Sequence, residues 1–192
     1  MQFTPKFLAV TAAALMATSA FAQTANTDVK AEKDRISSEY KAAKEQCKSL
    51  SGNAKDVCEK EAKGQEKVSR AELDYRQDAS DRNRHNVAKA KADAAYDVAK
   101  EKCDDLKGNA EDVCEKEAKA EHVKALEAAK VDQARQGSNM GDARGSNVAE
   151  ARQEGAEKVR EAEYKAANER CDAMSGDAKD KCQADAKRTY GQ

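Results

Sequence analysis

The sequence predicts an all-α fold made of three disulfide-stapled antiparallel helical hairpins, extended and with little shared core. Two observations lead to this prediction. Three segments of the chain align without gaps, and each contains one Cys-x10-Cys pair. The composition is also unsuited to an ordinary globular core, because 37% of the 192 residues are charged and only 4% are aromatic.

The first 22 residues are typical of a secretory signal peptide. Lys6 precedes an apolar run that extends from Phe7 to Ala17, and Ala20-Phe21-Ala22 form a small-x-small cleavage site. We therefore expect cleavage after Ala22 and export to the periplasm, where disulfides form and persist. All three Phe and Pro5, the one Pro, precede residue 23, so the expected mature chain has no Phe, Trp or Pro.

The repeats divide the remaining chain into units. The aligned segments are Tyr40 to Lys63, Tyr96 to Lys119 and Tyr164 to Lys187. We expect hairpin 1 over 23–79, hairpin 2 over 80–135, a flexible linker over 136–147 and hairpin 3 over 148–192. Residues 80–86 are expected to connect the first two hairpins, since this polar segment interrupts the helical pattern.

An apolar seam recurs in each repeat. Tyr, Ala, Cys and Leu or Met are spaced at i, i+3, i+7 and i+10, which places them on one face of a helix. The seam residues are Tyr40, Ala43, Cys47 and Leu50; Tyr96, Ala99, Cys103 and Leu106; and Tyr164, Ala167, Cys171 and Met174. Helices are expected near 28–50, 54–77, 87–107, 110–135, 148–174 and 178–190. Acid-to-base pairs at i, i+4 favour them further, namely Glu59/Lys63, Glu115/Lys119 and Glu161/Lys165.

Each predicted turn contains a helix stop signal followed directly by a start signal. Gly52, Gly108 and Gly176 suit the left-handed position that follows a helix. Asn53, Asn109 and Asp177 come next and are expected to be N-caps of the second helices. Three residues later, Asp56, Asp112 and Asp180 favour the first helical turn through the helix dipole.

This geometry predicts how the cysteines pair. At 1.5 Å per residue, both cysteines of a pair lie about 7 to 8 Å from the turn on opposite arms, so they are level with each other. Six cysteines allow about 15 connectivities, and the repeated level pair favours the local one. The expected bonds are Cys47–Cys58, Cys103–Cys114 and Cys171–Cys182. Each should contribute about 3 kcal/mol in the chain-entropy model, and redox or metal chemistry of these thiols is the alternative interpretation.

Charge and motifs argue against several classes of function. The two signs of charge alternate throughout, so we expect no nucleic-acid partner, and no second apolar run suggests a membrane span. No catalytic, cofactor or metal motif is recognisable, and we expect a protein that is not an enzyme and holds no cofactor. His85, in an expected loop, and His122, on a helix face, are predicted to be solvated. Tyr40, Tyr96 and Tyr164 are predicted to pack across their hairpins.

The signal sequence, the Ala/Lys/Glu-rich helices and the repeated CxxxxGNAxDxC resemble small exported proteobacterial proteins of unknown role, often labelled cell-envelope or TolA-like. The most specific matching sequence segments are CKSLSGNAKDVCEKEAK and CDDLKGNAEDVCEKEAK. The resemblance implies an envelope setting.

The leading hypothesis is a non-enzymatic periplasmic structural or interaction protein whose partner is an unidentified envelope protein. A periplasmic holdase chaperone is the alternative, and a thiol metal buffer or redox sink is the second alternative. The helices have so few large apolar residues that the sequence predicts neither whether the hairpins pack against one another nor whether the chain forms a homo-oligomer.

Overall fold

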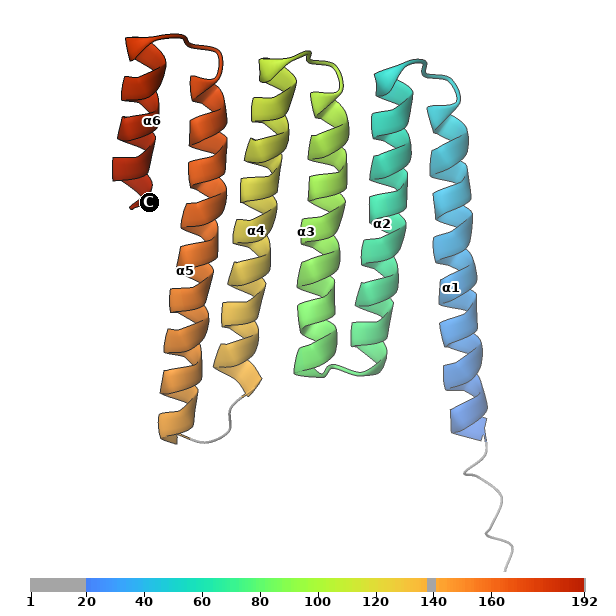
Figure 1. Ribbon diagram of the computed structural model, residues 1–192. Coiled ribbons are helices and arrows are strands. Elements are labelled where there is room, and N and C mark those ends of the chain that lie inside the picture. The colour runs from blue at the N-terminus through green and yellow to red at the C-terminus, as the bar shows by residue number, and fades with distance from the viewer. Residues whose placement is uncertain (1–19, 138–140, 192) are drawn as a thin grey trace, which may run out of the picture.

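The computed structural model describes residues 20–137 and 141–191, with side chains for 28–136 and 145–191. The described residues contain no strand and form six helices that run alternately up and down (Figure 1). They are α1 (Ala20–Cys47), α2 (Asn53–Gln77), α3 (Asp81–Cys103), α4 (Asn109–Gly137), α5 (Gly141–Cys171) and α6 (Asp177–Tyr190). The all-α prediction is confirmed. Residues 1–19 of the predicted signal peptide lie outside the described residues, and the expected cleavage point falls within α1.

The helices form a single row. Among the described residues, each helix contacts only the helix before it and the helix after it. Figure 1 shows the consequence, a one-layer array with the three disulfide-bonded turns at one end and the α2–α3 connection at the other. Both broad faces of the inner helices are therefore left uncovered by the rest of the described chain.

The core is a set of thin seams between neighbouring helices. Ile36 on α1 and Leu73 on α2 are the buried large aliphatic residues. The other buried apolar side chains are the first cysteine of each pair and six alanines: Ala62, Ala92, Ala120, Ala129, Ala166 and Ala186. Small side chains bury little area each, so the hydrophobic contribution per helix pair is modest.

The hairpins pack against one another, which the sequence had left open. The pairs α2/α3 and α4/α5 belong to different hairpins, yet their contacts are more extensive than those between the arms of hairpin 1 or hairpin 3. Glycines permit the close approach: a Cβ at Gly64 would lie 2.8 Å from the Ala94 Cβ, and one at Gly155 would lie 3.1 Å from the Glu127 Cβ.

The two outermost helices bury only one face. On α1, the buried and half-buried positions follow a single stripe that includes Ile36, Tyr40 and Cys47, and the opposite side is exposed and largely charged. The corresponding face of α6 exposes Lys181, Lys187 and Arg188. Polar outer faces are typical of the terminal units of repeat arrays, because they stop further units from stacking.

The connections differ from their predicted bounds. The linker expected over 136–147 is mostly helical where it is described, since α4 reaches Gly137 and α5 begins at Gly141; residues 138–140 of it lie outside the described residues. The connection expected over 80–86 is also shorter. Ser80 is the N-cap of α3, and its Oγ accepts a hydrogen bond from the Asn83 N–H at 3.3 Å. That local cap starts the helix within a segment that looked like a loop.

Candidate functional site

The three disulfide-bonded turns are the repeated chemical feature of the molecule. The bonds are Cys47–Cys58, Cys103–Cys114 and Cys171–Cys182, with Cα–Cα distances of 5.6, 5.6 and 5.7 Å. The predicted pairing is confirmed. These distances lie within the usual range for a disulfide, so the bonds hold each pair of arms at a separation that the helices themselves tolerate.

The first-arm helices end at their cysteines, earlier than expected. In hairpin 1, the backbone N–H of Lys48, Ser49 and Leu50 each donate to a carbonyl three residues earlier, which is the tighter 3₁₀ pattern that terminates many helices. Leu50, Leu106 and Met174 consequently leave the predicted seam. Their side chains are 43%, 41% and 46% exposed at the three turns.

The turn glycines and their successors have different roles from those predicted. Gly52 has φ 57° and ψ −153°, and Gly176 has φ 57° and ψ −147°, which is an extended mirror-image region open essentially to glycine alone. Both glycines are N-caps of the second arm rather than C′ residues of the first. Gly108 has φ 58°, and its carbonyl accepts from the N–H of Glu111 and Asp112 as the first bonds of α4.

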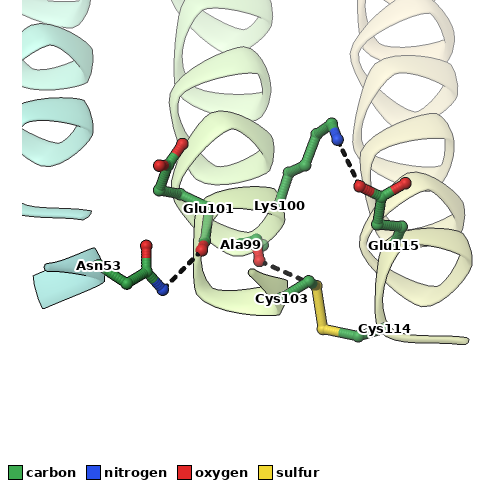
Figure 2. The surroundings of a disulfide bond; sticks show 7 residues. All are labelled: Asn53, Ala99, Lys100, Glu101, Cys103, Cys114 and Glu115. Carbon is green, nitrogen blue, oxygen red and sulfur yellow. Dashed lines mark hydrogen bonds and ion pairs between the residues drawn. A yellow bond between two sulfur atoms is a disulfide. The ribbon is translucent and has the colours of Figure 1, made fainter. Parts of the chain in front are cut away.

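Asn53, Asn109 and Asp177 are therefore the first residues of their helices, and the N-cap prediction for them is wrong. Freed from capping, the Asn53 Nδ2 donates a hydrogen bond to the Glu101 carbonyl at 2.9 Å (Figure 2). The Lys60 Nζ lies 3.2 Å from an oxygen of the Glu101 carboxylate. These contacts tie hairpin 1 to hairpin 2 near the disulfides.

All six cysteine sulfur atoms are in disulfides, so the described form has no thiolate to offer a metal or an oxidant. The first cysteine of each pair is fully buried, while the second is half-buried. Figure 2 marks a contact of 3.2 Å between the Cys103 sulfur and the Ala99 carbonyl oxygen. A disulfide sulfur has no proton to donate, so this is a packing contact. Within residues 28–136 and 145–191, no group of three or more His, Cys, Asp or Glu side chains is arranged to hold a metal ion.

The interfaces between hairpins repeat in register. Lys102 on α3 lies 3.6 Å from Glu61 on α2, and Arg170 on α5 lies 2.6 Å from Glu117 on α4. These are equivalent positions of the aligned repeats. Each pair is solvent-exposed and contributes roughly 0 to 1 kcal/mol, so it sets the register of the hairpins more than their stability.

The helix-supporting pairs expected at i, i+4 form in one case of the three. The Lys165 Nζ lies 2.7 Å from the Glu161 Oε1. In the other two pairs, Lys63 interacts with Glu66 at 3.1 Å, and Glu115 reaches across its hairpin to Lys100 (Figure 2).

A half-buried polar cluster of Asp93, Tyr96 and His122 joins α3 to α4. The His122 Nε2 lies 2.7 Å from the Asp93 Oδ1, and the His122 ring stacks on Tyr96 with centroids 4.6 Å apart. Because a carboxylate oxygen can only accept, Nε2 carries a proton; Nδ1 is buried and has no hydrogen-bond partner among the described residues. The prediction of a solvated His122 is wrong, since its side chain is 10% exposed. His85 lies within α3 rather than in a loop, half-buried, with Nδ1 3.4 Å from the Ala129 carbonyl oxygen.

Two of the three seam tyrosines pack across their hairpins as predicted. The Lys63 Nζ lies 5.2 Å from the Tyr40 ring centroid, and the Lys119 Nζ lies 5.2 Å from the Tyr96 ring centroid. The two contacts occupy equivalent repeat positions and are cation–π interactions. Tyr164 is half-buried.

Carboxylates at helix contacts have lowered pKa values. A hydrogen bond from Arg35, followed by the interactions with Arg76, lowers the pKa of Glu32 to about 2. Burial raises the pKa of Asp93, but hydrogen bonds from Lys89 and His122 outweigh it, so the net shift is downward. These groups are ionised near neutral pH and act as fixed charges between helices.

Comparison with protein-family models, with curated proteins and with solved structures finds no match for this chain. Over the described residues, no helix combines the length and the apolar character needed to cross a bilayer. The site must therefore be interpreted from its own geometry, which consists of three disulfide-bonded turns, open grooves between helices, and ion pairs that repeat between hairpins.

Proposed function

We propose that this chain is a non-catalytic structural or interaction protein of the cell envelope, exported to the periplasm, which presents its helical array to a partner protein. The observation that carries the proposal is the single layer, in which each described helix contacts only its sequence neighbours. Such an array leaves both broad faces of the inner helices accessible to another molecule (Figure 1).

The disulfides and the ion pairs between hairpins suit a binding surface formed by a single layer of helices. A layer held by alanine seams has little buried area to keep its helices level. Covalent bonds at three turns and ion pairs between hairpins hold the helices in register before any partner binds. A surface that is already ordered loses less conformational entropy on binding than one that must order itself.

Three disulfides in a small chain support an oxidising compartment. Together with the signal peptide predicted over 1–22, they support the periplasm. Fractionation of the producing cells tests this part directly, because recovery of the protein only from the cytoplasm, with free thiols, would contradict it.

Site-specific photo-cross-linking in living cells tests the interaction role. A photoreactive residue at Ala95, which lines the α2/α3 groove, or at Lys165, which lines the α4/α5 groove, should give discrete adducts with a particular envelope protein. Ser38 is exposed on α1, away from the stripe that contacts α2, and is the matched control. Adducts at the groove positions that are absent from Ser38 support the proposal. The same adducts at all three positions, or none at any, would refute it.

A holdase chaperone is the second candidate, favoured by the exposure of Leu50, Leu106 and Met174. These residues belong to the three disulfide-bonded turns, which lie at the same end of the array (Figure 1). Exposed apolar side chains can contact unfolded clients. Suppression of aggregation of a model client should then be lost in the L50Q/L106Q/M174Q variant while the helix content is unchanged. Equal behaviour of the variant and the parent protein would exclude these turns as the client site.

A further inference from the structure

The groove between α4 and α5 contains a cavity of about 250 Å³. Its floor is apolar and consists of Val123 and Leu126 from α4 and Ala162 from α5. Leu126 is half-buried and contributes to this floor. The volume is slightly below the range of about 300 to 1,000 Å³ typical of small-molecule sites, which suits a short chain or a single ring.

The equivalent face of the α2/α3 pair, which is not the α2/α3 groove lined by Ala95, provides an internal comparison. In the aligned repeats, Val123 corresponds to Lys67 and Lys165 corresponds to Asp97. The Lys67 Nζ lies 3.0 Å from the Asp97 Oδ2, so an ion pair spans the two helices there. In the α4/α5 groove a valine replaces the lysine and a lysine replaces the aspartate, so this bridge cannot form.

The rim of the α4/α5 cavity has an excess of positive charge. It contains four lysines and two carboxylates. Glu161 is neutralised by Lys165 at 2.7 Å, and Glu127 by Lys130 at 2.6 Å. Among the residues that the structure describes, the Lys116 Nζ lies within 4.0 Å of no carboxylate oxygen. The Lys119 ammonium lies 5.2 Å from the centroid of the Tyr96 ring, on the α3 side of α4. Lys116 is therefore the rim lysine whose ammonium group is available to an anion at one end of the apolar floor.

We infer that the α4/α5 groove binds a monocarboxylate with a short alkyl chain. The carboxylate pairs with the Lys116 ammonium, Lys119 adds positive charge at longer range, and the chain lies along Val123 and Leu126. Lys119 and Leu126 are about 10 Å apart along the helix axis at 1.5 Å per residue, which leaves room for a short chain such as that of octanoate. Ammonium-to-carboxylate contacts beside an apolar floor are stronger than the same contacts in open water, because the floor lowers the local dielectric. Lys165 lines this cavity and is also a cross-linking position for the proposed protein partner, but octanoate binding is measured on the isolated protein and does not depend on that partner.

Octanoate, kept below its micelle concentration, is the probe. In a titration of the disulfide-intact protein followed by amide NMR shifts, saturable changes should concentrate at 116–126 and 158–165. The variant V123K/K165D recreates the Lys67–Asp97 ion pair and should weaken octanoate binding about tenfold or more, which corresponds to about 1.4 kcal/mol. The variant K116Q/K119Q changes only exposed side chains and should have the same effect.

Two controls separate this site from general adsorption. V68K introduces, in the α2/α3 groove lined by Ala95, the lysine found at the equivalent Lys124, which is outside the α4/α5 cavity; it should leave octanoate affinity unchanged. Neutral 1-octanol should bind about tenfold or more weakly than octanoate, since it lacks the charge. The inference is overturned if no saturable shift occurs in the α4/α5 groove, if the V123K/K165D and K116Q/K119Q variants bind like the parent, or if octanol binds as tightly as octanoate.

Discussion

Removal of the Cys171–Cys182 bond should unfold α6 selectively. This helix has 14 residues, and α5 is its contact partner within the described chain. Isolated helices shorter than about 12 to 15 residues are marginal in water, and Ala186 is the buried residue that α6 contributes. The disulfide closes a loop with a sequence separation of 11, for which the chain-entropy relation gives about 3 kcal/mol.

That magnitude should dominate the stability of α6. A loss of about 3 kcal/mol raises the population of the locally open form by roughly two orders of magnitude. The variant C171A/C182A is the suitable perturbation, because Cys171 is fully buried and alanine adds no unpaired polar group there. Amide hydrogen exchange in 177–190 should accelerate by about that factor, while α3 and α4 keep their protection.

The other two disulfides are internal controls. In C103A/C114A the arms are α3 and α4, which are also held on their outer sides by α2 and α5, so the smallest change is expected there. C47A/C58A should be intermediate, since α1 is longer and buries Ile36 against its neighbour. Unchanged protection of α6 in C171A/C182A, or a larger loss in C103A/C114A, would refute the reasoning that the bonds matter most where a helix has one neighbour.

Three further predictions concern backbone and charge. Gly64→Ala places a Cβ 2.8 Å from that of Ala94 and should lower the free energy of unfolding, measured by urea denaturation, by about 1 to 2 kcal/mol. In the control Gly145→Ala the new Cβ meets nothing within 4 Å, so the change should be neutral or stabilising by up to about 1 kcal/mol. Equal effects of the two substitutions would contradict the close approach of α2 and α3 at Gly64. Gly52→Ala also meets nothing within 4 Å, so its cost of about 1 to 3 kcal/mol, measured in the same way, should arise from the backbone conformation alone; a neutral result would exclude the glycine-only turn. Because the pKa of Glu32 is about 2 in the folded chain against an ordinary value of 4.5, its contribution is present above pH 4.5 and is lost as the pH falls towards 2. The thermal midpoint should therefore be flat from pH 8 to 5 and fall below about pH 4.5, more steeply in the parent than in Glu32→Gln, and parallel curves for the two proteins would contradict the assignment.

Local chemistry was enough to predict the second-arm helices and the cysteine pairing, whereas the first arms begin six to eight residues earlier than expected, at Ala20, Asp81 and Gly141. The Cys-x10-Cys spacing places two sulfurs level across a turn whatever surrounds it, so the three bonds follow from helix rise alone. The second arms begin within one residue of the prediction, because the Gly-Asn-Ala or Gly-Asp-Ala start signal is local. The first arms end three or four residues early, since the choice between an α-helical last turn and a 3₁₀ turn depends on how the backbone reaches the glycine.

The histidine cluster was not predictable in the same way. His122 and Asp93 are 29 residues apart and belong to different helices. A sequence-level signal did exist, since Tyr96 and His122 are on helices that a level disulfide brings side by side. To predict that His122, and not a neighbouring residue of α4, contacts Tyr96, one must also know how α4 is oriented about its own axis, and the sequence does not give that orientation.

The order of residues along the chain determined where the second-arm helices start, which cysteines meet and that no large core forms, because these depend on backbone hydrogen bonds, turn conformations and composition. The tertiary structure alone decided that the hairpins lie side by side in one layer, that Gly64 and Gly155 bring neighbouring helices close, and that the α4/α5 cavity stays open while the Lys67–Asp97 ion pair spans the equivalent face of α2/α3. Those outcomes depend on the rotation and separation of whole helices, and such quantities are set by the sum of many small side-chain contacts between distant parts of the chain.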